Sequence, residues 1–251
     1  MKAMIFAAGM GTRLKPLTDT LPKALVSVCG KPLLEHVTRK LLAAGFDQAV
    51  VNVHHFADMV EEWIDGQDLM TMQVSDERKM LLETGGAVFH ARRFFEGCGS
   101  FLVHNVDILS DLDIPWFMST ARPEALATLL VSERKSSRYL LFDPETMRLV
   151  GWTNVQTGEV RSPYPDLDVS ECRALAFSGI HIISDRVFEA MEEYIKDKGL
   201  AGDDTPRFPI IDFYLSIIGN LDVYGVVADN LNLIDVGKLD TLAVAESFLS
   251  V

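Results

Sequence analysis

A glycine-rich segment near the N-terminus carries residues that could bind a polyphosphate. Gly9, Gly11 and Arg13 alternate along the chain, and Lys23 follows a little later. Glycines expose backbone N–H groups to phosphate oxygens. The planar guanidinium of an arginine suits paired hydrogen bonds to phosphate, and a lysine adds a mobile positive charge. These residues predict a site that binds and neutralises phosphate groups.

A second polar cluster ends an apolar segment in the middle of the chain. Residues 101–104 are mostly apolar, and Asn105 and Asp107 follow them. An aspartate at the carboxyl end of a strand can bind a metal ion, although it can equally form a turn. The cluster therefore makes Asp107 a candidate metal ligand.

The elements that position these residues follow from hydrophobic periodicity. Residues 2–8 form an apolar run typical of a buried parallel strand, and residues 9–22 form a loop. Open α/β sheets bind ligands outside the carboxyl ends of their strands, which is where this loop begins. Residues 32–44 predict a helix that ends at Gly45. Further predicted strands are 49–53, 100–104, 125–132, 139–142, 174–183, 223–227 and 231–236, and further helices are 57–64, 84–95, 114–120, 186–196, 209–218 and 239–248.

The alternation of strands and helices predicts an α/β fold. We expect a mostly parallel sheet with helices on both faces. The chain has 251 residues, and we expect a single domain over residues 1–251. Residues 143–173 have weak periodicity and many turn formers, so we interpret them as an insertion or lid.

The charge distribution favours a small anionic partner. The formal net charge is −13, which argues against a nucleic-acid partner. Residues 1–40 nevertheless hold seven basic and two acidic residues, a local charge of +5. A basic region on an acidic protein suits a small polyanion that is attracted to one place.

Cysteine content and hydropathy indicate a cytoplasmic protein without a membrane partner. The three cysteines, Cys29, Cys98 and Cys172, form no CxxC motif, so we expect reduced thiols rather than a disulfide framework or a zinc site. No signal-peptide cleavage pattern follows the first apolar run. No apolar stretch approaches the roughly 20 residues that span a membrane.

Three simple interpretations of the N-terminal loop compete with a specific resemblance. A dinucleotide-binding turn needs a third glycine, but this chain has Leu14 at that position. A Walker P-loop ends in Gly-Lys-Ser/Thr, and this ending is absent from the loop. A surface loop leaves the two nearby cations unexplained. The string GMGTRLKPLT followed by PKAL instead closely resembles the signature loop of the sugar-phosphate nucleotidyltransferase family.

The resemblance implies the Rossmann-like nucleotide-diphospho-sugar transferase fold, a nucleoside triphosphate and a sugar 1-phosphate as substrates, and Mg²⁺ as cofactor. Two carboxylates with phosphate oxygens and waters suit that ion. Several site residues follow from it. The implied triphosphate contacts are Ala8, Gly9, Gly11, Thr12 and Arg13, and Lys23 is implied to neutralise the α-phosphate. The implied nucleoside turn contains Glu83, Gly85 and Gly86, and the implied acceptor contact is Asn105. The implied Mg²⁺ ligands are Asp107 and Asp235.

Two parts of the sequence leave the acceptor site open. Gly179 lies in the segment that resembles the family strand beneath the acceptor, but a strand bulge explains a glycine there equally well. Many relatives hold the acceptor phosphate with a Glu-Lys-Pro lysine, which is absent between residues 140 and 175. Arg138, Arg161 or Arg173 could replace it. The six histidines show no metal-binding spacing.

The implied reaction transfers a nucleoside monophosphate from a triphosphate to a sugar 1-phosphate and releases pyrophosphate. The turn at residues 83–86 most resembles that of uridylyltransferases for N-acetylmuramate 1-phosphate and of guanylyltransferases for heptose or mannose 1-phosphate, and we favour UTP. A cytidylyltransferase, a catalytically silent nucleotide-sugar sensor and a nicotinamide-dependent dehydrogenase remain alternatives.

Overall fold

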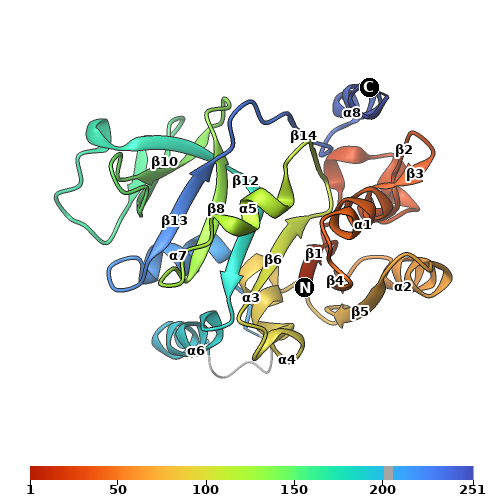
Figure 1. Cartoon of the computed structure of the whole chain (residues 1–251), viewed down its shortest axis with the longest axis horizontal. Helices are drawn as coiled ribbons and strands as arrows, with labels where there is room; N and C mark the ends of the chain where they lie inside the picture. Colours follow the sequence, from red (N-terminus) through yellow and green to blue (C-terminus); the bar gives the residue numbers. More distant parts are fainter. Residues whose placement is uncertain (201–205, 251) are drawn as a thin grey trace. The chain divides into compact units, whose positions relative to one another are not determined.

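The first apolar run forms a central parallel strand, as predicted. In the computed structural model, which describes residues 1–200 and 206–250, β1 (Lys2–Phe6) is buried in the core (Figure 1). It pairs in parallel with β4 (Gln48–Val53) on one side and with β6 (Ser100–Asn105) on the other. Strands buried on both faces need continuous apolar sequence, which this run supplies.

The chain divides into two compact units. Unit 1 contains residues 1–81, 101–115 and 231–251, and unit 2 contains residues 82–100 and 116–230. The prediction of a single domain over residues 1–251 stays a prediction.

Unit 1 has a parallel sheet in the order β6-β1-β4-β5, with β5 spanning Thr71–Asp76. Short antiparallel ribbons supplement it. They are β2 (Ser27–Val28) with β3 (Lys31–Pro32), and β7 (Ile108–Ser110) with β14 (Leu233–Asp235). Its helices are α1 (Leu33–Ala43), α2 (Ala57–Gly66) and α8 (Leu239–Leu249), with 3₁₀ turns at Thr12–Leu14, Leu17–Asp19 and Lys23–Leu25.

Helix α1 ends as its sequence predicts. Gly45 adopts a left-handed conformation with φ of 85°, which a residue without a Cβ tolerates. The N–H of Phe46 donates to the carbonyl of Leu41 at 3.0 Å, and that of Gly45 donates to Leu42 at 3.0 Å. This pair of hydrogen bonds is a Schellman motif, which satisfies the last carbonyls of the helix.

Unit 2 has a mixed sheet. Strand β8 (Ala127–Ser132) pairs in parallel with β13 (Val223–Val227) and antiparallel with β12 (Arg173–Ser184) (Figure 1). The other strands are β9 (Arg138–Phe142), β10 (Leu149–Asn154) and β11 (Glu159–Arg161), and the helices are α3 (Glu83–His90), α4 (Arg92–Phe95), α6 (Val187–Asp197) and α7 (Ile210–Ile217), while α5 (Ile114–Ser119) begins in unit 1.

The α/β class is confirmed. In the sheet of unit 1, strands β6, β1, β4 and β5 all pair in parallel, as predicted. The segment 143–173 contributes β10 and β11 to an antiparallel meander with β9, and its interpretation as an insertion or lid stays a prediction. Hairpin strands of this kind pair with their sequence neighbours, so they need no long apolar run. The predicted helix over residues 84–95 is divided into α3 and α4.

Gly179 lies at a bulge in β12. Its φ is 75°, and the pairing register with β8 shifts between Phe177 and His181. A bulge with a left-handed residue requires glycine, so the bulge alone explains this residue. No helix among the described residues has both the length and the apolar character needed to cross a membrane.

Candidate active site

The loop after β1 leaves one glycine open and uses another to turn. A Cβ at Gly9 would meet no atom within 4 Å, so packing does not require a glycine there. Gly11 has φ of 62°, and a Cβ on it would lie 2.8 Å from the Thr18 methyl group. Its carbonyl accepts hydrogen bonds from Leu14 N–H and Thr18 Oγ1, both at 2.8 Å. Gly11 therefore determines the conformation of the loop, while the backbone at Gly9 has open space beside it that a ligand could occupy.

A buried polar pair fixes the start of this loop. The amide oxygen of Asn52 accepts the Ala7 N–H at 2.8 Å, and its amide nitrogen donates to Glu77 Oε1 at 2.8 Å. Asn52 and Glu77 are 4% and 2% exposed. Buried polar groups persist when they are hydrogen-bonded, and here they hold the backbone that leads into Ala8 and Gly9. Sequence reasoning missed this pair, although an asparagine and a glutamate at the ends of neighbouring strands were visible.

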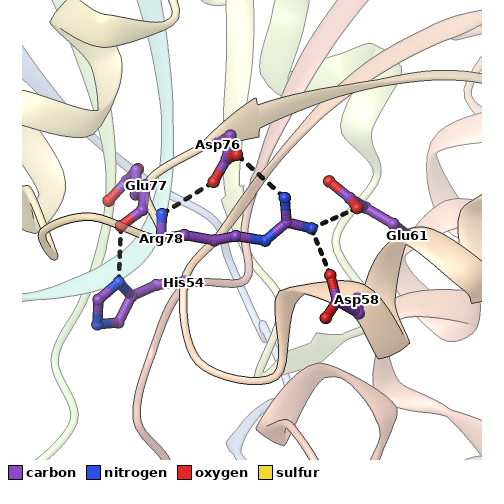
Figure 2. Close-up of polar contacts among 6 residues, drawn as sticks. All are labelled: His54, Asp58, Glu61, Asp76, Glu77 and Arg78. Carbon is purple, nitrogen blue, oxygen red and sulfur yellow. Dashed lines mark hydrogen bonds and ion pairs between the residues drawn. The ribbon is translucent and has the colours of Figure 1, made fainter.

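The turn that carries Glu77 is tied to helix α2. Figure 2 shows the Arg78 guanidinium contacting carboxylates of Asp58, Glu61 and Asp76, with 2.9 Å to Asp58 and 3.1 Å to Asp76. Nδ1 of His54 lies 2.7 Å from the Glu77 carbonyl. Exposed ion pairs are worth little singly, but a network around one arginine restrains the turn.

Lys23 and Asp107 form an ion pair in unit 1. Lys23 Nζ donates to Asp107 Oδ2, and Lys23 as a whole is 8% exposed. A buried ammonium persists only with a partner, and Asp107, just past the end of β6, supplies it. The structure thus brings together a predicted phosphate-neutralising residue and a predicted metal ligand.

The two predicted metal ligands also meet. Asp235 is the last residue of β14 and lies opposite Ile108, which follows Asp107. The Val236 N–H donates to the Asp107 carbonyl at 2.8 Å. At the other end of this ribbon, the Asn232 side chain donates to Asp111 Oδ2 at 2.7 Å. The β7–β14 ribbon therefore joins two carboxylates that lie far apart in the sequence.

Gly237 brings Arg13 beside Asp235. A Cβ at Gly237 would lie 2.6 Å from Asp235 Oδ1 and 2.7 Å from Arg13 Nη2. Both groups consequently occupy the space that a side chain would fill. A glycine at this position therefore lets the Arg13 and Asp235 side chains lie close together.

The donor set of this cluster fits Mg²⁺. Asp107 and Asp235 supply carboxylate oxygens, the ligands that Mg²⁺ prefers, and Asp235 is exposed. Among the described residues, no group of three or more histidines, cysteines or carboxylates could hold a metal ion. A two-carboxylate site suits Mg²⁺ because this ion usually keeps waters and substrate phosphates as its remaining ligands.

The backbone of Ser110 in β7 is held by a lysine from α1. Lys40 Nζ donates to the Ser110 carbonyl at 2.8 Å, and burial lowers the pKa of Lys40 while Asp111 and Asp113 oppose that shift. The neighbouring strand β6 contains His104, whose burial lowers its pKa to about 4. His104 is therefore neutral at physiological pH and donates from Nδ1 to the Asn105 carbonyl at 2.8 Å.

The predicted acceptor and triphosphate contacts at this edge differ in exposure. Asn105 is half-buried at the end of β6 and lies opposite Phe6 of β1. Thr12 is exposed in the 3₁₀ turn that follows Gly11. Their roles toward substrate remain predictions.

The predicted nucleoside turn lies in unit 2 and has strong internal contacts. The N–H groups of Gly85 and Gly86 donate to the Phe208 carbonyl at 2.8 and 3.1 Å. A Cβ at Gly85 would lie 2.4 Å from the Phe208 ring, and one at Gly86 would lie 2.3 Å from the Pro206 carbonyl. These contacts explain both glycines structurally, so their role in nucleoside binding stays a prediction.

Thr84 ties the same turn to the start of α7, and Glu83 ties it to Arg207 in the segment before that helix. The Glu83 carboxylate accepts from Arg207 Nη2 at 2.8 Å, and Thr84 Oγ1 accepts the Ile210 N–H at 2.9 Å. Glu83 has a positive φ of 62°, which a residue other than glycine adopts only under local restraint. The ion pair between Glu83 and Arg207 and the hydrogen bond between Thr84 and Ile210 supply that restraint.

The arginines considered for the acceptor phosphate have different surroundings. Arg173 Nη2 pairs with Glu133 at 2.9 Å. Arg138 and Arg161 instead line one cavity of unit 2. The structure therefore separates Arg173 from the other two.

A parallel sheet with a glycine loop, a lysine, an arginine and two carboxylates at its carboxyl edge defines an α/β enzyme of phosphate chemistry. The sequence comparisons identify its class. The chain belongs to the nucleotidyl transferase family, whose model matches residues 2–142.

Relatives and solved structures agree with this assignment. An N-acetylmuramate alpha-1-phosphate uridylyltransferase of Caulobacter vibrioides is 37% identical over 189 residues, covering 72% of this chain and 74% of that protein. The enzyme of that name from Neisseria meningitidis is 33% identical over 196 residues, covering 76% and 79%. The structure of HddC from Yersinia pseudotuberculosis complexed with GMP-PN superposes with a TM-score of 0.72 at 20% identity, covering 99% of both chains, which shows the same fold. The protein is thus a sugar-1-phosphate nucleotidyltransferase.

Proposed function

We propose that this enzyme transfers UMP from UTP to N-acetylmuramate 1-phosphate, with Mg²⁺ as cofactor and pyrophosphate as the second product. The uridylyl donor and the acceptor are those in the names of the relatives from Caulobacter vibrioides and Neisseria meningitidis. The product, a nucleotide-activated cell-wall sugar, would be made in the cytoplasm. Three free cysteines suit that reducing compartment.

The chemistry is an in-line displacement at the α-phosphorus. An acceptor phosphate oxygen forms a bond to the α-phosphorus, and the bond from that phosphorus to the oxygen bridging to the β-phosphate breaks. Pyrophosphate leaves with the electron pair. Because the attacking oxygen is already anionic, the reaction needs no strong general base. Catalysis then depends on positioning and on neutralising charge.

The residues of unit 1 have complementary roles in this displacement. The open backbone at Gly9 receives the triphosphate, and Arg13 binds its oxygens. Lys23 neutralises the charge that develops on the α-phosphate. Asp107 and Asp235 would hold Mg²⁺, which when bound supplies further charge neutralisation of the phosphates.

The observation that carries this proposal is the meeting of Lys23, Asp107 and Asp235. An ion pair joins the first two, and a backbone hydrogen bond from Val236 holds the third beside them. A nucleotide-sugar sensor would not need this lysine and both carboxylates, so their convergence favours an active enzyme.

Pyrophosphate release tests the proposal. The purified protein is incubated with Mg²⁺ and each of UTP, GTP, CTP, ATP and dTTP, with N-acetylmuramate 1-phosphate, N-acetylglucosamine 1-phosphate or mannose 1-phosphate. We expect the highest rate with UTP and N-acetylmuramate 1-phosphate. A higher rate with GTP or CTP would replace the donor in the proposal. Absence of release from every pair would contradict it.

A further inference from the structure

Strand β1 stops pairing with β4 just before the glycine loop, and a side chain of β4 then takes over. The backbone pairing of the two strands runs to Phe6, which lies opposite Asn52. The following backbone donor, the Ala7 N–H, donates to the side-chain oxygen of Asn52 at 2.8 Å. Ala8 is buried like Ala7, whereas Gly9 is exposed. The Asn52 side chain therefore holds the backbone at the point where the chain leaves the sheet.

The orientation of the Asn52 amide depends on Glu77. An amide has an accepting oxygen and a donating nitrogen, and only the oxygen can bind the Ala7 N–H. An ionised carboxylate only accepts, and Glu77 Oε1 takes the amide nitrogen of Asn52 at 2.8 Å. A flipped amide would place a donor against a donor and an acceptor against an acceptor, both buried, which is costly. Glu77 thereby fixes which end of the amide faces the loop.

The turn after β5 restrains Glu77 itself. The Glu77 N–H donates to the Val53 carbonyl at 2.8 Å, and the Glu77 carbonyl lies 2.7 Å from His54 Nδ1 (Figure 2). Arg78, the next residue, contacts the Asp58 carboxylate of α2 at 2.9 Å. The end of β4 therefore holds both the backbone and the carboxylate of Glu77, and α2 supports the turn.

The polar character of this buried pair needs a reason beyond stability. Taking a carboxylate and an amide out of water is costly, and apolar side chains of similar volume often stabilise a core as well or better. Apolar residues would, however, leave the buried Ala7 N–H without an acceptor. The pair thus maintains one conformation of the backbone that leads to Gly9, where there is open space for a ligand.

We infer that Asn52 and Glu77 are positioning residues for the triphosphate. Asn52 holds the backbone of residues 7–9 in the conformation that receives the phosphates, and Glu77 holds Asn52. Both act through the backbone, because both are buried. This inference rests on the proposed function only in taking the loop after β1 as the segment that binds the triphosphate.

The affinity for UTP relative to UMP reports the position of the loop, because UMP lacks two of the three phosphates. Asn52→Leu removes both hydrogen bonds at similar volume and without a change of charge. With Mg²⁺ and no acceptor, we expect this variant to raise the Kd of UTP at least about 10-fold and that of UMP less than about threefold. A loss of stability alone would lower the folded fraction and weaken both affinities equally.

A matched control removes a buried hydrogen bond elsewhere in the chain. The Tyr214 hydroxyl lies 2.9 Å from His181 Nδ1 in the core of unit 2. Tyr214→Phe removes this contact and keeps the ring, so it should change stability and leave the ratio of the UTP and UMP affinities unchanged.

Exchanging the two polar groups tests the pairing of Asn52 with Glu77. Asn52→Asp keeps an acceptor for Ala7 but places a second carboxylate beside Glu77, so it should weaken UTP binding relative to UMP. The double variant Asn52→Asp, Glu77→Gln restores the hydrogen bond with its direction reversed, because the glutamine amide donates to the aspartate. We expect its affinity ratio to return to within about threefold of the wild type, which identifies the two residues as a coupled pair.

Two results would overturn the inference. One is an unchanged ratio of UTP and UMP affinities in a folded Asn52→Leu protein, and the other is a double variant that binds UTP no better than Asn52→Asp. The exchange provides the test where Asn52→Leu does not fold. Neither measurement needs an acceptor or turnover, so a wrong acceptor in the proposed function would not affect them. GTP and GMP are measured in parallel, and they replace UTP and UMP if GTP binds the wild type more tightly.

Discussion

Lys23 and Asp107 form an ion pair in which the lysine is nearly buried. The two residues follow different strands, because Lys23 lies in the loop region after β1 and Asp107 lies just beyond β6. Parallel strands place their carboxyl ends at one edge of a sheet, so residues that follow neighbouring strands meet there. The ion pair fixes the position of the lysine side chain at this edge of the sheet.

Replacing Lys23 should abolish most activity. We expect Lys23→Ala to lower kcat at least about 100-fold, because one charge partner of a developing phosphate charge is typically worth that much. Lys23→Arg keeps the charge and should retain more activity than the alanine variant. The measurement is steady-state pyrophosphate release, with the melting temperature recorded to identify misfolded protein. Near-normal turnover of a folded Lys23→Ala variant would remove the lysine from the mechanism.

A methyl group at Gly237 should disturb two site residues together. Gly237→Ala places an atom where Arg13 and Asp235 now lie, so both side chains must move. We expect kcat/KM to fall about 10-fold or more, since small displacements of positioning groups can cost up to about 100-fold. Gly66→Ala in α2 is the control, because its added Cβ meets nothing within 4 Å. If both variants keep full activity, the arrangement at Gly237 has no catalytic role.

Gly85 tests whether the turn in unit 2 is structural. An added Cβ would overlap the Phe208 ring, and overpacking of this kind costs about 1–3 kcal/mol of unfolding free energy. We therefore expect Gly85→Ala to lower stability in chemical denaturation by that amount. Gly219→Ala, where the nearest atom is 3.8 Å away, should be close to neutral. A stable Gly85→Ala protein with a raised KM for the nucleotide would assign the glycine to nucleoside binding instead.

The sequence predicted the parallel part of the fold because its signals are local. The apolar run before the loop predicted β1, because a strand buried on both faces needs consecutive apolar residues. Gly45 predicted the end of α1, because a left-handed residue at a helix end is usually glycine. The meeting of Asp107 and Asp235 is different. It depends on β7 pairing with β14, and the pairing of segments so distant in the chain is not visible in hydrophobic periodicity.

Other site features also depend on tertiary contacts. Gly85 and Gly86 suggested a ligand turn, but residues 206–208 pack against them and use their N–H groups. Burial alternates along β10, but β10 and β11 are short and turn formers surround them, so no long apolar run marks this segment in the sequence. Arg138 and Arg161 were among several candidate arginines, and only the folded cavity separated them from Arg173.

Burial of His181 should make stability fall in acid. His181 is 1% exposed, its Nδ1 lies 2.9 Å from the Tyr214 hydroxyl, and burial lowers its pKa from 6.5 to about 3. Between these values the unfolded chain binds the proton and the folded chain does not, so stability is complete above pH 6.5 and falls below it. At pH 5 this group costs about 2 kcal/mol.

Denaturation of the wild type and of His181→Gln between pH 8 and pH 5 measures this effect. The wild type should lose more unfolding free energy over that range than the variant, by about the 2 kcal/mol attributed to this group. Equal losses in the two proteins would show that His181 does not contribute to acid sensitivity.

Removal of divalent metal should stop the reaction, and Asp235 should set how much metal is needed. We expect a chelator to abolish pyrophosphate release and added Mg²⁺ to restore it. Asp235→Asn should raise the Mg²⁺ concentration for half-maximal rate about 10-fold or more, since one of two carboxylate ligands loses its charge. Activity that persists in chelator, or an unchanged Mg²⁺ requirement in the variant, would contradict the assignment of Asp235.

The most direct test of the central claim follows the phosphates of the donor. UTP labelled at the α-phosphate and UTP labelled at the γ-phosphate are each incubated with N-acetylmuramate 1-phosphate, Mg²⁺ and the enzyme, and the products are separated. We predict that the α label enters the nucleotide sugar and that the γ label leaves in pyrophosphate. Transfer of the γ label to the sugar, or no transfer of the α label to any sugar phosphate, would contradict nucleotidyl transfer by this site.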